Sequence, residues 1–337
     1  MSIPQATDAR RLRSSATHFV SVWNLAILLV LLILVFSFLK GDTFLTAFTF
    51  QSIMNSRSIN ALVALAVMIP LASNNFDLSV ASILGISQVL ANGLQTQQGL
   101  PWELAALACI ALGALVGLVN GLLVTRAKIN SFIATLGTGT LLLGLNQWYT
   151  GGRQVVGLLP ADFVALSGKI PYTGVPAAVV YVLIIAIVLW IVFDYLPLGR
   201  YLYVIGDSPR AAELTGINAS TYVTLAFVAS GTLAAFAGVV LQAQLQVGQS
   251  TVGQELMLPA FTGALLGATA IRPGRPNVWG TVLAVAVLAV AVAGLTQLGA
   301  QFFVENLFNG AMLILAVGLA GYTQRRRERR NAAAKAG

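Results

Sequence analysis

The sequence has almost none of the side chains that build metal sites and catalytic triads. It contains one histidine, His18, and one cysteine, Cys109, among 337 residues. A metal site built from histidines or cysteines needs several such ligands, and a Ser-His-Asp triad needs a positioned histidine. A single cysteine also excludes a disulfide within the chain. We therefore expect neither a metal nor any other cofactor, and no catalysis by a histidine-dependent triad.

Charged residues are also scarce. They make up 9% of the sequence, whereas hydrophobic residues make up 57% and the mean hydropathy is +0.84. A soluble domain carries about 25% charged residues, so this chain cannot cover a water-facing surface and is predicted to be an integral membrane protein. The net charge of +8 could indicate nucleic-acid binding. Basic residues in a membrane protein usually mark cytoplasmic loops instead, so we expect no nucleic-acid partner.

Long apolar runs, separated by polar or Gly/Pro segments, predict an all-α polytopic fold with about ten transmembrane helices. The first run follows a basic stretch, as in a signal peptide, but no small-x-small site closes it, so we interpret it as an uncleaved span. The second, third and eighth runs are short or contain polar residues, which is typical of broken or re-entrant helices. The predicted spans are 20–39, 53–71, 78–94, 104–124, 132–149, 176–195, 222–241, 256–271, 279–298 and 303–322.

The distribution of lysine and arginine supports an even number of spans with both termini in the cytoplasm. In that orientation fifteen of the nineteen basic residues lie on the cytoplasmic side, and the exceptions are Lys40, Arg57, Arg153 and Lys169. This asymmetry follows the positive-inside rule. We expect a cytoplasmic segment over 1–19, a transmembrane domain over 20–322 and a basic tail over 323–337, whose RRRERR run would lie against anionic lipid.

Gly113, Gly117 and Gly121 are spaced four residues apart within one apolar run. On a helix this spacing forms a smooth stripe that lets two helix backbones approach closely, which is how helices commonly associate in lipid. The stripe predicts a tightly packed bundle and does not indicate a particular function.

The segment SNNFDLSVAS, residues 73–82, places polar side chains between two apolar runs. An aspartate at the centre of a membrane helix costs roughly 2.5–3.5 kcal/mol on the insertion scale, so we expect Asp77 in a protein interior, a water-filled cavity or the membrane surface. Two interpretations stay open, because Asp77 could cap the next helix or contact a transported solute. The candidates for the translocation pathway or a helix break are Asn74, Asn75, Asp77, Ser79, Asn120 and Glu255.

The longest predicted cytoplasmic connection, residues 198–222, is polar but patterned. Residues 209–214 predict a short helix, with Ser208 as its N-cap and Gly216 as its stop, and Gly206 and Gly216 are expected to bracket this helix with flexible ends. Arg210 and Glu213 are three residues apart and can pair on the exposed face of that helix. The loop is therefore either an ordered helix that docks on a partner protein or an ordinary surface loop with one helical turn.

Four segments together resemble a known family. They are FDLSVAS (76–82), NGLLVTRAKINSFIATLGT (120–138), LGRYLYVIGDSPRAAELTGIN (198–218) and GALLGATAIRPGRPNVWGT (263–281). They follow one another in the order, and near the spacing, of the permease subunits of bacterial sugar ABC importers, such as the ribose, xylose and arabinose permeases. The resemblance runs from about residue 20 to residue 322.

This resemblance implies a multi-pass protein of the bacterial inner membrane with a fold similar to type II importers. An inverted internal repeat would relate spans two to five to spans seven to ten. It also implies a homodimer or heterodimer of permease chains, a separate ATP-binding subunit and a periplasmic solute-binding protein that delivers a sugar or polyol. The residues that fall on the family's ATPase-coupling loop, 198–218, are Arg200, Gly206, Arg210, Ala211, Ala212, Glu213, Leu214 and Gly216.

The sequence departs from the family at several positions. Asn74, Asn75 and Phe76 stand where the family usually has Gly-Gly-Ile, and Met257 stands where an aspartate is usual, so the solute need not be ribose. The chain has no G-x-x-x-x-G-K-[ST] motif, so ATP hydrolysis would occur on a partner and not on this chain. An ion-coupled secondary transporter, using Asp77 and Glu255, is the alternative function, and a membrane enzyme is a third class without a supporting constellation.

Overall fold

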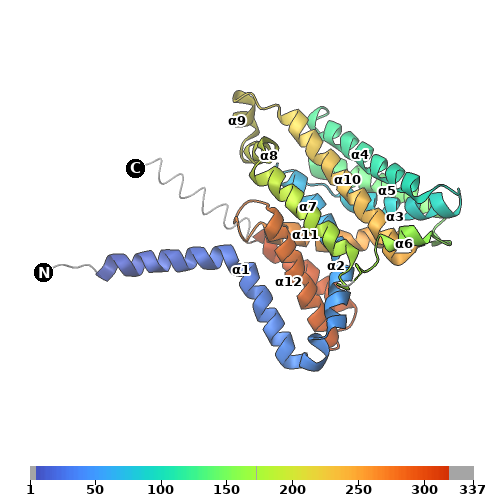
Figure 1. Cartoon of the computed structure of the whole chain (residues 1–337). Coiled ribbons are helices and arrows are strands. Elements are labelled where there is room, and N and C mark those ends of the chain that lie inside the picture. Colours follow the sequence, from blue (N-terminus) through green and yellow to red (C-terminus); the bar gives the residue numbers. More distant parts are fainter. Residues whose placement is uncertain (1–4, 172, 319–337) are drawn as a thin grey trace.

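The computed structural model describes residues 5–171 and 173–318, with side chains from residue 22 onward, so the predicted basic tail lies outside the described residues. Within this part the chain is α-helical apart from two short strands, and each predicted span overlaps one helix, although residues 319–322 of the last predicted span lie outside the described residues (Figure 1). These helices are α1 (Gln5–Phe44), α2 (Ala47–Leu71), α3 (Ser79–Thr96), α4 (Trp102–Thr125), α5 (Ser131–Thr150), α7 (Ala177–Asp194), α10 (Ala219–Leu245), α11 (Val252–Gly267), α12 (Val278–Gln297) and Phe303–Gly318.

Short elements complete the described structure. A small helix, α6 (Ala161–Ala165), follows α5, and two further helices, α8 (Pro197–Asp207) and α9 (Pro209–Leu214), form the long connection after α7. Two short strands, β1 (Val155–Val156) and β2 (Val247–Gly248), pair in antiparallel fashion. This pairing joins the segment after α5 to the segment after α10.

Six of the described helices are long and apolar enough to cross a membrane by themselves, namely α1 from residue 22, α2, α4, α7, α10 and α12. The helices α3, α5, α11 and Phe303–Gly318 are shorter or more polar. The expectation of a short or broken second span was wrong, because α2 runs without interruption for 25 residues. Its polar first half is already helical, so the predicted span began six residues too late.

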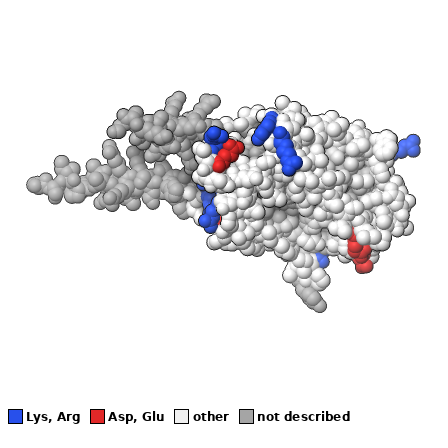
Figure 2. Space-filling view, turned by 90° about the horizontal axis from the view of Figure 1, so that it is seen from above, with Lys and Arg blue, Asp and Glu red and all other residues white. Residues whose placement is uncertain are grey.

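The centre of the bundle is formed by α2, α3, α10 and α12. In the apolar windows of α2, α10 and α12, 67% of the residues are buried, compared with 11% for α1 and 22% for α7. The exposed faces of α1 and α7 carry leucine, isoleucine and valine, which suit contact with lipid. On the face shown in Figure 2, charged side chains occupy only small, separate areas.

The two halves of the chain pack on each other in a reciprocal way. The first helix of the second half, α10, packs on α3 and α4 of the first half. Likewise α2 packs on α11 and α12. If spans two to five correspond to spans seven to ten, these two sets of contacts are equivalent. The reciprocal packing is what an inverted repeat requires, and the repeat itself stays a prediction.

The glycine stripe of α4 packs directly on the backbone of α10. A Cβ atom at Gly113 or Gly117 would overlap the carbonyl oxygens of Gly231 and Phe227 respectively. At Gly121 it would lie 2.7 Å from the Cα atom of Thr224. The prediction of close helix packing along this stripe is confirmed.

Candidate functional site

A break of seven residues, 72–78, separates α2 from α3. The chain turns at Asn74, whose φ of +58° lies in the left-handed region that asparagine tolerates better than most residues. The carbonyl oxygen of Pro70 accepts hydrogen bonds from the amides of Ser73 and Asn75, and the Asn75 side chain donates to the Ser73 carbonyl at 3.0 Å. The break is therefore an ordered turn that leads into α3.

Asp77 lies at the end of this break and is fully buried. Its Oδ1 atom accepts hydrogen bonds from the amide and the hydroxyl of Ser79, at 3.1 and 2.5 Å. Its Oδ2 atom accepts a hydrogen bond from the hydroxyl of Ser230 in α10 at 3.0 Å. The expectation that Asp77 is the N-cap was off by one residue, because the N-cap of α3 is Leu78, but the Asp77 carboxylate still accepts from the amide of the first helical residue, Ser79. A buried carboxylate is tolerated when several donors surround it, as here.

The hydrogen bonds continue from Ser79 into α4 and α5. The Asn120 side chain donates to the Ser79 hydroxyl at 2.8 Å, and Thr138 donates to the Asn120 side-chain oxygen at 2.8 Å. Two hydroxyls of α5 hold the backbone of the break, because the amides of Phe76 and Leu78 donate to Ser131 and Thr135. Four helices, α3, α4, α5 and α10, therefore meet around Asp77.

The α5 hydroxyls and Ser230 were not among the residues predicted from the sequence. A signal was available for α5, because Ser131, Thr135 and Thr138 are four and three residues apart and so share one helix face. Ser230 gave no comparable signal, since it is a lone serine in an apolar helix. Among the predicted pathway candidates, the structure brings together Asp77, Ser79 and Asn120.

The remaining pathway candidates lie elsewhere. Asn74 is exposed and Asn75 half-buried on the side of the break that faces α8 and α9. Glu255 is exposed in the first turn of α11 and lies outside the network around Asp77. Glu255 and Asp77 therefore do not form the paired acidic site that the secondary-transporter alternative would use.

A second break, residues 246–251, separates α10 from α11 and has its own buried polar support. Gln88 of α3 donates from its Nε2 atom to the Gln242 side chain at 2.7 Å and to the Val247 carbonyl at 2.5 Å. Its Oε1 atom accepts from the amide of Gln249 at 3.0 Å. Gln88 and Gln242 are both fully buried. Each break is thus bonded to at least one buried side chain of the other half of the bundle, Ser230 for the first break and Gln88 for the second.

The long connection after α7 holds the helix that the sequence predicted. Helix α9 spans Pro209–Leu214, the Ser208 hydroxyl accepts from the amide of Ala211 at 3.3 Å, and Gly216 has a φ of +82°. The prediction of one short helix was incomplete, because α8 precedes α9 and starts at Pro197.

Helix α9 buries one side and exposes the other. Ala212 is buried, whereas Arg210, Ala211, Glu213 and Leu214 are exposed. Arg210 and Glu213 form the expected pair at 3.4 Å. Arg200 is exposed on α8, where its guanidinium donates to the Tyr195 carbonyl at 3.1 Å. The exposed side of the loop therefore presents both charge and one large apolar side chain.

Gly206 places this loop directly against the α2–α3 break. A Cβ atom at Gly206 would lie 2.6 Å from the Ala72 carbonyl oxygen, so only glycine permits this contact. The expectation that Gly206 would give α9 a flexible end was wrong, because it lies inside α8 and packs against backbone. A cavity of about 600 Å³ lies beside this contact, with Asn74, Asn75, Lys128 and Glu213 in its lining.

The loop before α12 also contacts α8. Arg275 pairs with Asp207 at 2.7 Å, and Arg272 forms a two-pronged pair with Asp194 at 2.5 and 2.9 Å. The Tyr203 hydroxyl donates to the Pro276 carbonyl at 2.7 Å. Burial raises the pKa of Tyr203 to about 12, so the phenol keeps the proton that it donates. These contacts make α8 a firmly held element.

Comparisons with known proteins agree with a transport role. The family model described as the branched-chain amino acid transport system permease component matches residues 49–317. The chain is similar to the ribose import permease protein of Bacillus subtilis (strain 168), with 31% identity over 86% of this chain and 89% of that protein. It is also similar to the ribose import permease protein of Escherichia coli (strain K12), with 30% identity over 90% and 96% of the two chains.

A third relative carries a different sugar in its name. The fructose import permease protein of Rhizobium meliloti is 28% identical over 87% of this chain and 83% of that protein. No solved structure matches the chain significantly. Together with the apolar helices of the described residues, the family match makes this a multi-pass membrane protein with a transport role. The chain belongs to the family of permease components that this family model describes.

Proposed function

We propose that the chain is the permease subunit of an ATP-binding-cassette importer that moves a sugar or polyol across the bacterial inner membrane. A separate ATP-binding subunit would drive it, a periplasmic solute-binding protein would feed it, and two permease chains would form the pore. The observation that carries the proposal is the contact between Gly206 of α8 and Ala72, which joins an exposed helical loop to the break between two membrane helices.

This contact gives a physical route for coupling. In the proposal the ATPase docks on the exposed side of α8 and α9, through Arg200, Arg210 and Leu214, on the predicted cytoplasmic side of the membrane. A movement of α8 would be passed through backbone contact to Ala72, and then through Asp77 to α3, α4, α5 and α10. Ala212 and Gly216 would act differently, by seating α9 and ending it.

The roles of the pathway candidates divide by their surroundings. Asp77, Ser79 and Asn120 are enclosed and bonded to one another, which supports a role in holding the break and not in touching a solute. Asn74 and Glu255 are exposed and have polar groups that can bind the hydroxyls of a sugar. We therefore assign solute contact to the second group. The relatives named for ribose and fructose support a sugar as the solute class.

Reconstitution tests this function directly. The chain, its ATP-binding subunit and its solute-binding protein would be placed in proteoliposomes, and uptake of radiolabelled ribose, xylose, fructose and galactose measured. We expect uptake of at least one sugar that requires ATP and the binding protein and persists when a protonophore collapses the proton gradient. A variant of the ATPase that lacks its Walker-A lysine provides the control. Uptake driven by a proton or sodium gradient without ATP would instead establish the secondary transporter.

A further inference from the structure

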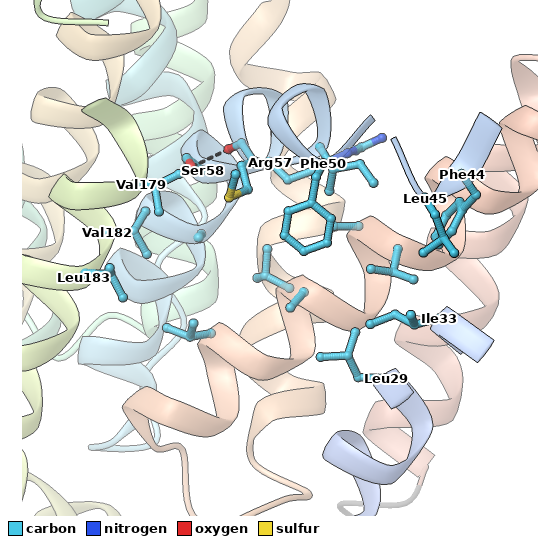
Figure 3. A pocket seen from close by; sticks show the side chains of 18 residues that line it. Leu29, Ile33, Phe44, Leu45, Phe50, Arg57, Ser58, Val179, Val182 and Leu183 are labelled. Carbon is cyan, nitrogen blue, oxygen red and sulfur yellow. Dashed lines mark hydrogen bonds between the residues drawn. The ribbon is translucent and has the colours of Figure 1, made fainter. Parts of the chain in front are cut away.

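An apolar groove lies between α1, α2, α7 and α12, with a volume of about 290 Å³ (Figure 3). Its walls include Leu29 and Ile33 of α1, Phe50 of α2 and Val182 of α7. The ring of Phe50 lies in the middle of the view, between the chain segments that form the walls. Helix α1 packs mainly on α12, so the space beside α2 is left open.

The groove lies within the membrane. All four of its walls are helices that are long and apolar enough to span a bilayer. Along α2 the lining reaches from Phe50 to Ala61, which is about 16 Å at 1.5 Å per residue. The hydrocarbon core of a bilayer is about 30 Å thick, so the groove extends through roughly one leaflet. An occupant of this space must be apolar and about as long as one acyl chain.

The two polar side chains in the lining, Arg57 and Ser58, each have a partner within the protein. The guanidinium of Arg57 pairs with Glu305 at 2.6 Å, and the Ser58 hydroxyl donates to the Met54 carbonyl at 2.5 Å. A sugar would find few free hydrogen-bonding groups here, which separates the groove from the solute path. An acyl chain forms no hydrogen bonds, so it does not need free polar groups in the groove. It can also pack on the methylene groups of Arg57.

The end of the groove near the start of α2 carries an exposed cation. The Lys169 ammonium donates to the Gln51 side chain at 2.8 Å. Gln51 follows Phe50 in the sequence; Phe50 lines the groove, whereas Gln51 and Lys169 lie beside it. An ammonium has three donors, so Lys169 can hold a phosphate as well as Gln51. A cation at the membrane surface above an apolar groove is the arrangement that suits a phospholipid, whose charged head and apolar tail are covalently joined.

We propose that this groove binds one acyl chain of a phospholipid from the leaflet at the N-terminal end of α2, with the lipid phosphate at Lys169. The bound chain fills the space between α1 and α2 and keeps α1 seated on α12. The site is independent of the proposed function, since it concerns the lipid-facing side of the helices and requires neither ATP nor sugar.

Photo-crosslinking tests the site. The full chain would be reconstituted in nanodiscs of phosphatidylethanolamine containing phosphatidylglycerol with a diazirine on one acyl chain, and the crosslinked peptides mapped by mass spectrometry. We expect crosslinks concentrated in residues 50–61, 179–183 and 282–290. Crosslinks spread equally over the lipid-facing surfaces of α4 and α5 would overturn the proposal.

Two variants fill the groove from opposite walls, Ala286→Phe in α12 and Val179→Phe in α7. Each should lower the groove crosslinks by about tenfold, the loss expected when about two fewer methylene groups of the lipid are buried. Ala108→Phe places the same side chain on an exposed position of α4 and is the matched control. A size-exclusion profile would show whether each variant folds. If one of the two groove variants fails to fold, crosslinking of the other variant decides whether the groove binds lipid. Unchanged crosslinking in a folded variant contradicts the site.

The headgroup assignment has its own test. Lys169→Gln removes the ammonium, so it should reduce crosslinking of the anionic phosphatidylglycerol probe more than that of a zwitterionic phosphatidylcholine probe with the same photoreactive chain. Unchanged crosslinking of the phosphatidylglycerol probe in a folded Lys169→Gln variant would overturn the placement of the phosphate at Lys169.

Discussion

Ser230 donates a hydrogen bond to the Oδ2 atom of Asp77 at 3.0 Å, although the two residues are 153 positions apart. Ser230 belongs to α10, in the second half of the chain, and Asp77 ends the break in the first half. Both residues are fully buried. This bond attaches the break to a central helix of the bundle and joins the two halves of the chain.

Substitution of Asp77 should separate a structural role from a proton-carrying role. Asp77→Asn keeps an oxygen that accepts from the Ser79 amide, whereas Asp77→Leu leaves the donors of Ser79 and Ser230 without this acceptor. Each unsatisfied buried donor costs about 1–3 kcal/mol, so we expect a clear loss of thermal stability for leucine and a smaller one for asparagine. Thermal unfolding in detergent and solute uptake would both be measured.

The coupled-ion alternative gives the opposite result for uptake. If the charge of Asp77 carried a proton, Asp77→Asn would abolish uptake as fully as Asp77→Leu while its level in the membrane stayed normal. That result would favour the secondary transporter. Thr232→Ala is a suitable control for effects of expression and purification. In the described structure the Thr232 hydroxyl bonds only within α10, to the Val228 carbonyl.

The two glycines of the α8–α9 loop should respond differently to valine. Gly216 has a φ of +82° and open space around it, so Gly216→Val strains the backbone locally by about 1–2 kcal/mol and tilts α9. We expect normal membrane insertion, with ATP hydrolysis uncoupled from transport or the ATPase released. Co-purification of the ATPase and solute-stimulated ATPase activity would measure this. Wild-type values of both, with uptake intact, would show that the loop is not the coupling element.

Gly206→Val acts on the membrane side of the same loop. A side chain at Gly206 would meet the Ala72 carbonyl and displace α8 from the break, so we expect reduced thermal stability as well as reduced transport. The ATPase should still co-purify, because the exposed side chains of α8 and α9 that it contacts in the proposal are unchanged. A Gly206→Val variant with wild-type uptake would remove the proposed contact from the coupling route.

The glycine stripe of α4 allows a test of helix packing. Gly117→Val should prevent the close approach of α4 and α10 and cost at least about 3 kcal/mol, the upper range for overpacking a core. Gly137 lies on an exposed position of α5 with no atom near its missing side chain, and it is the matched control. The ratio of folded to aggregated protein after detergent extraction would report the difference. Equal ratios for Gly117→Val and Gly137→Val would contradict this packing.

Orientation in the membrane can be tested with single cysteines. With both termini in the cytoplasm, Ala161→Cys in α6 should react with a membrane-impermeant thiol reagent in cells whose outer membrane has been permeabilised, and Ala332→Cys should not. The native Cys109 is buried, so it should contribute little background. Labelling of Ala332→Cys under these conditions would reverse the predicted topology.

Features that depend on nearby residues could be predicted from the sequence. The apolar runs located the helices because each run must span or enter the membrane. Helix α9 was found because its cap at Ser208, its first residue Pro209 and its stop at Gly216 are all local signals. The glycine stripe of α4 was found for the same reason, since its regular spacing is visible within one helix.

Features that join distant segments could not be predicted in this way. Gln88 and Gln242 are 154 residues apart, and each alone is a single polar residue in an apolar helix. Gly206 was assigned the wrong role because the sequence does not distinguish a flexible glycine from one that permits close packing. The contact with Ala72 depends on how α8 folds back onto the end of α2, which only the tertiary structure shows.

The contact between α4 and α10 determines where the molecule can bend. At Gly113 and Gly117 the helices meet backbone to backbone, so there are no side chains whose rotamers could adapt to a sliding or rocking motion. We therefore expect α4 and α10 to move together as one rigid unit. We predict that a path opens and closes away from this contact, by rearrangement of the two non-helical breaks, 72–78 and 246–251.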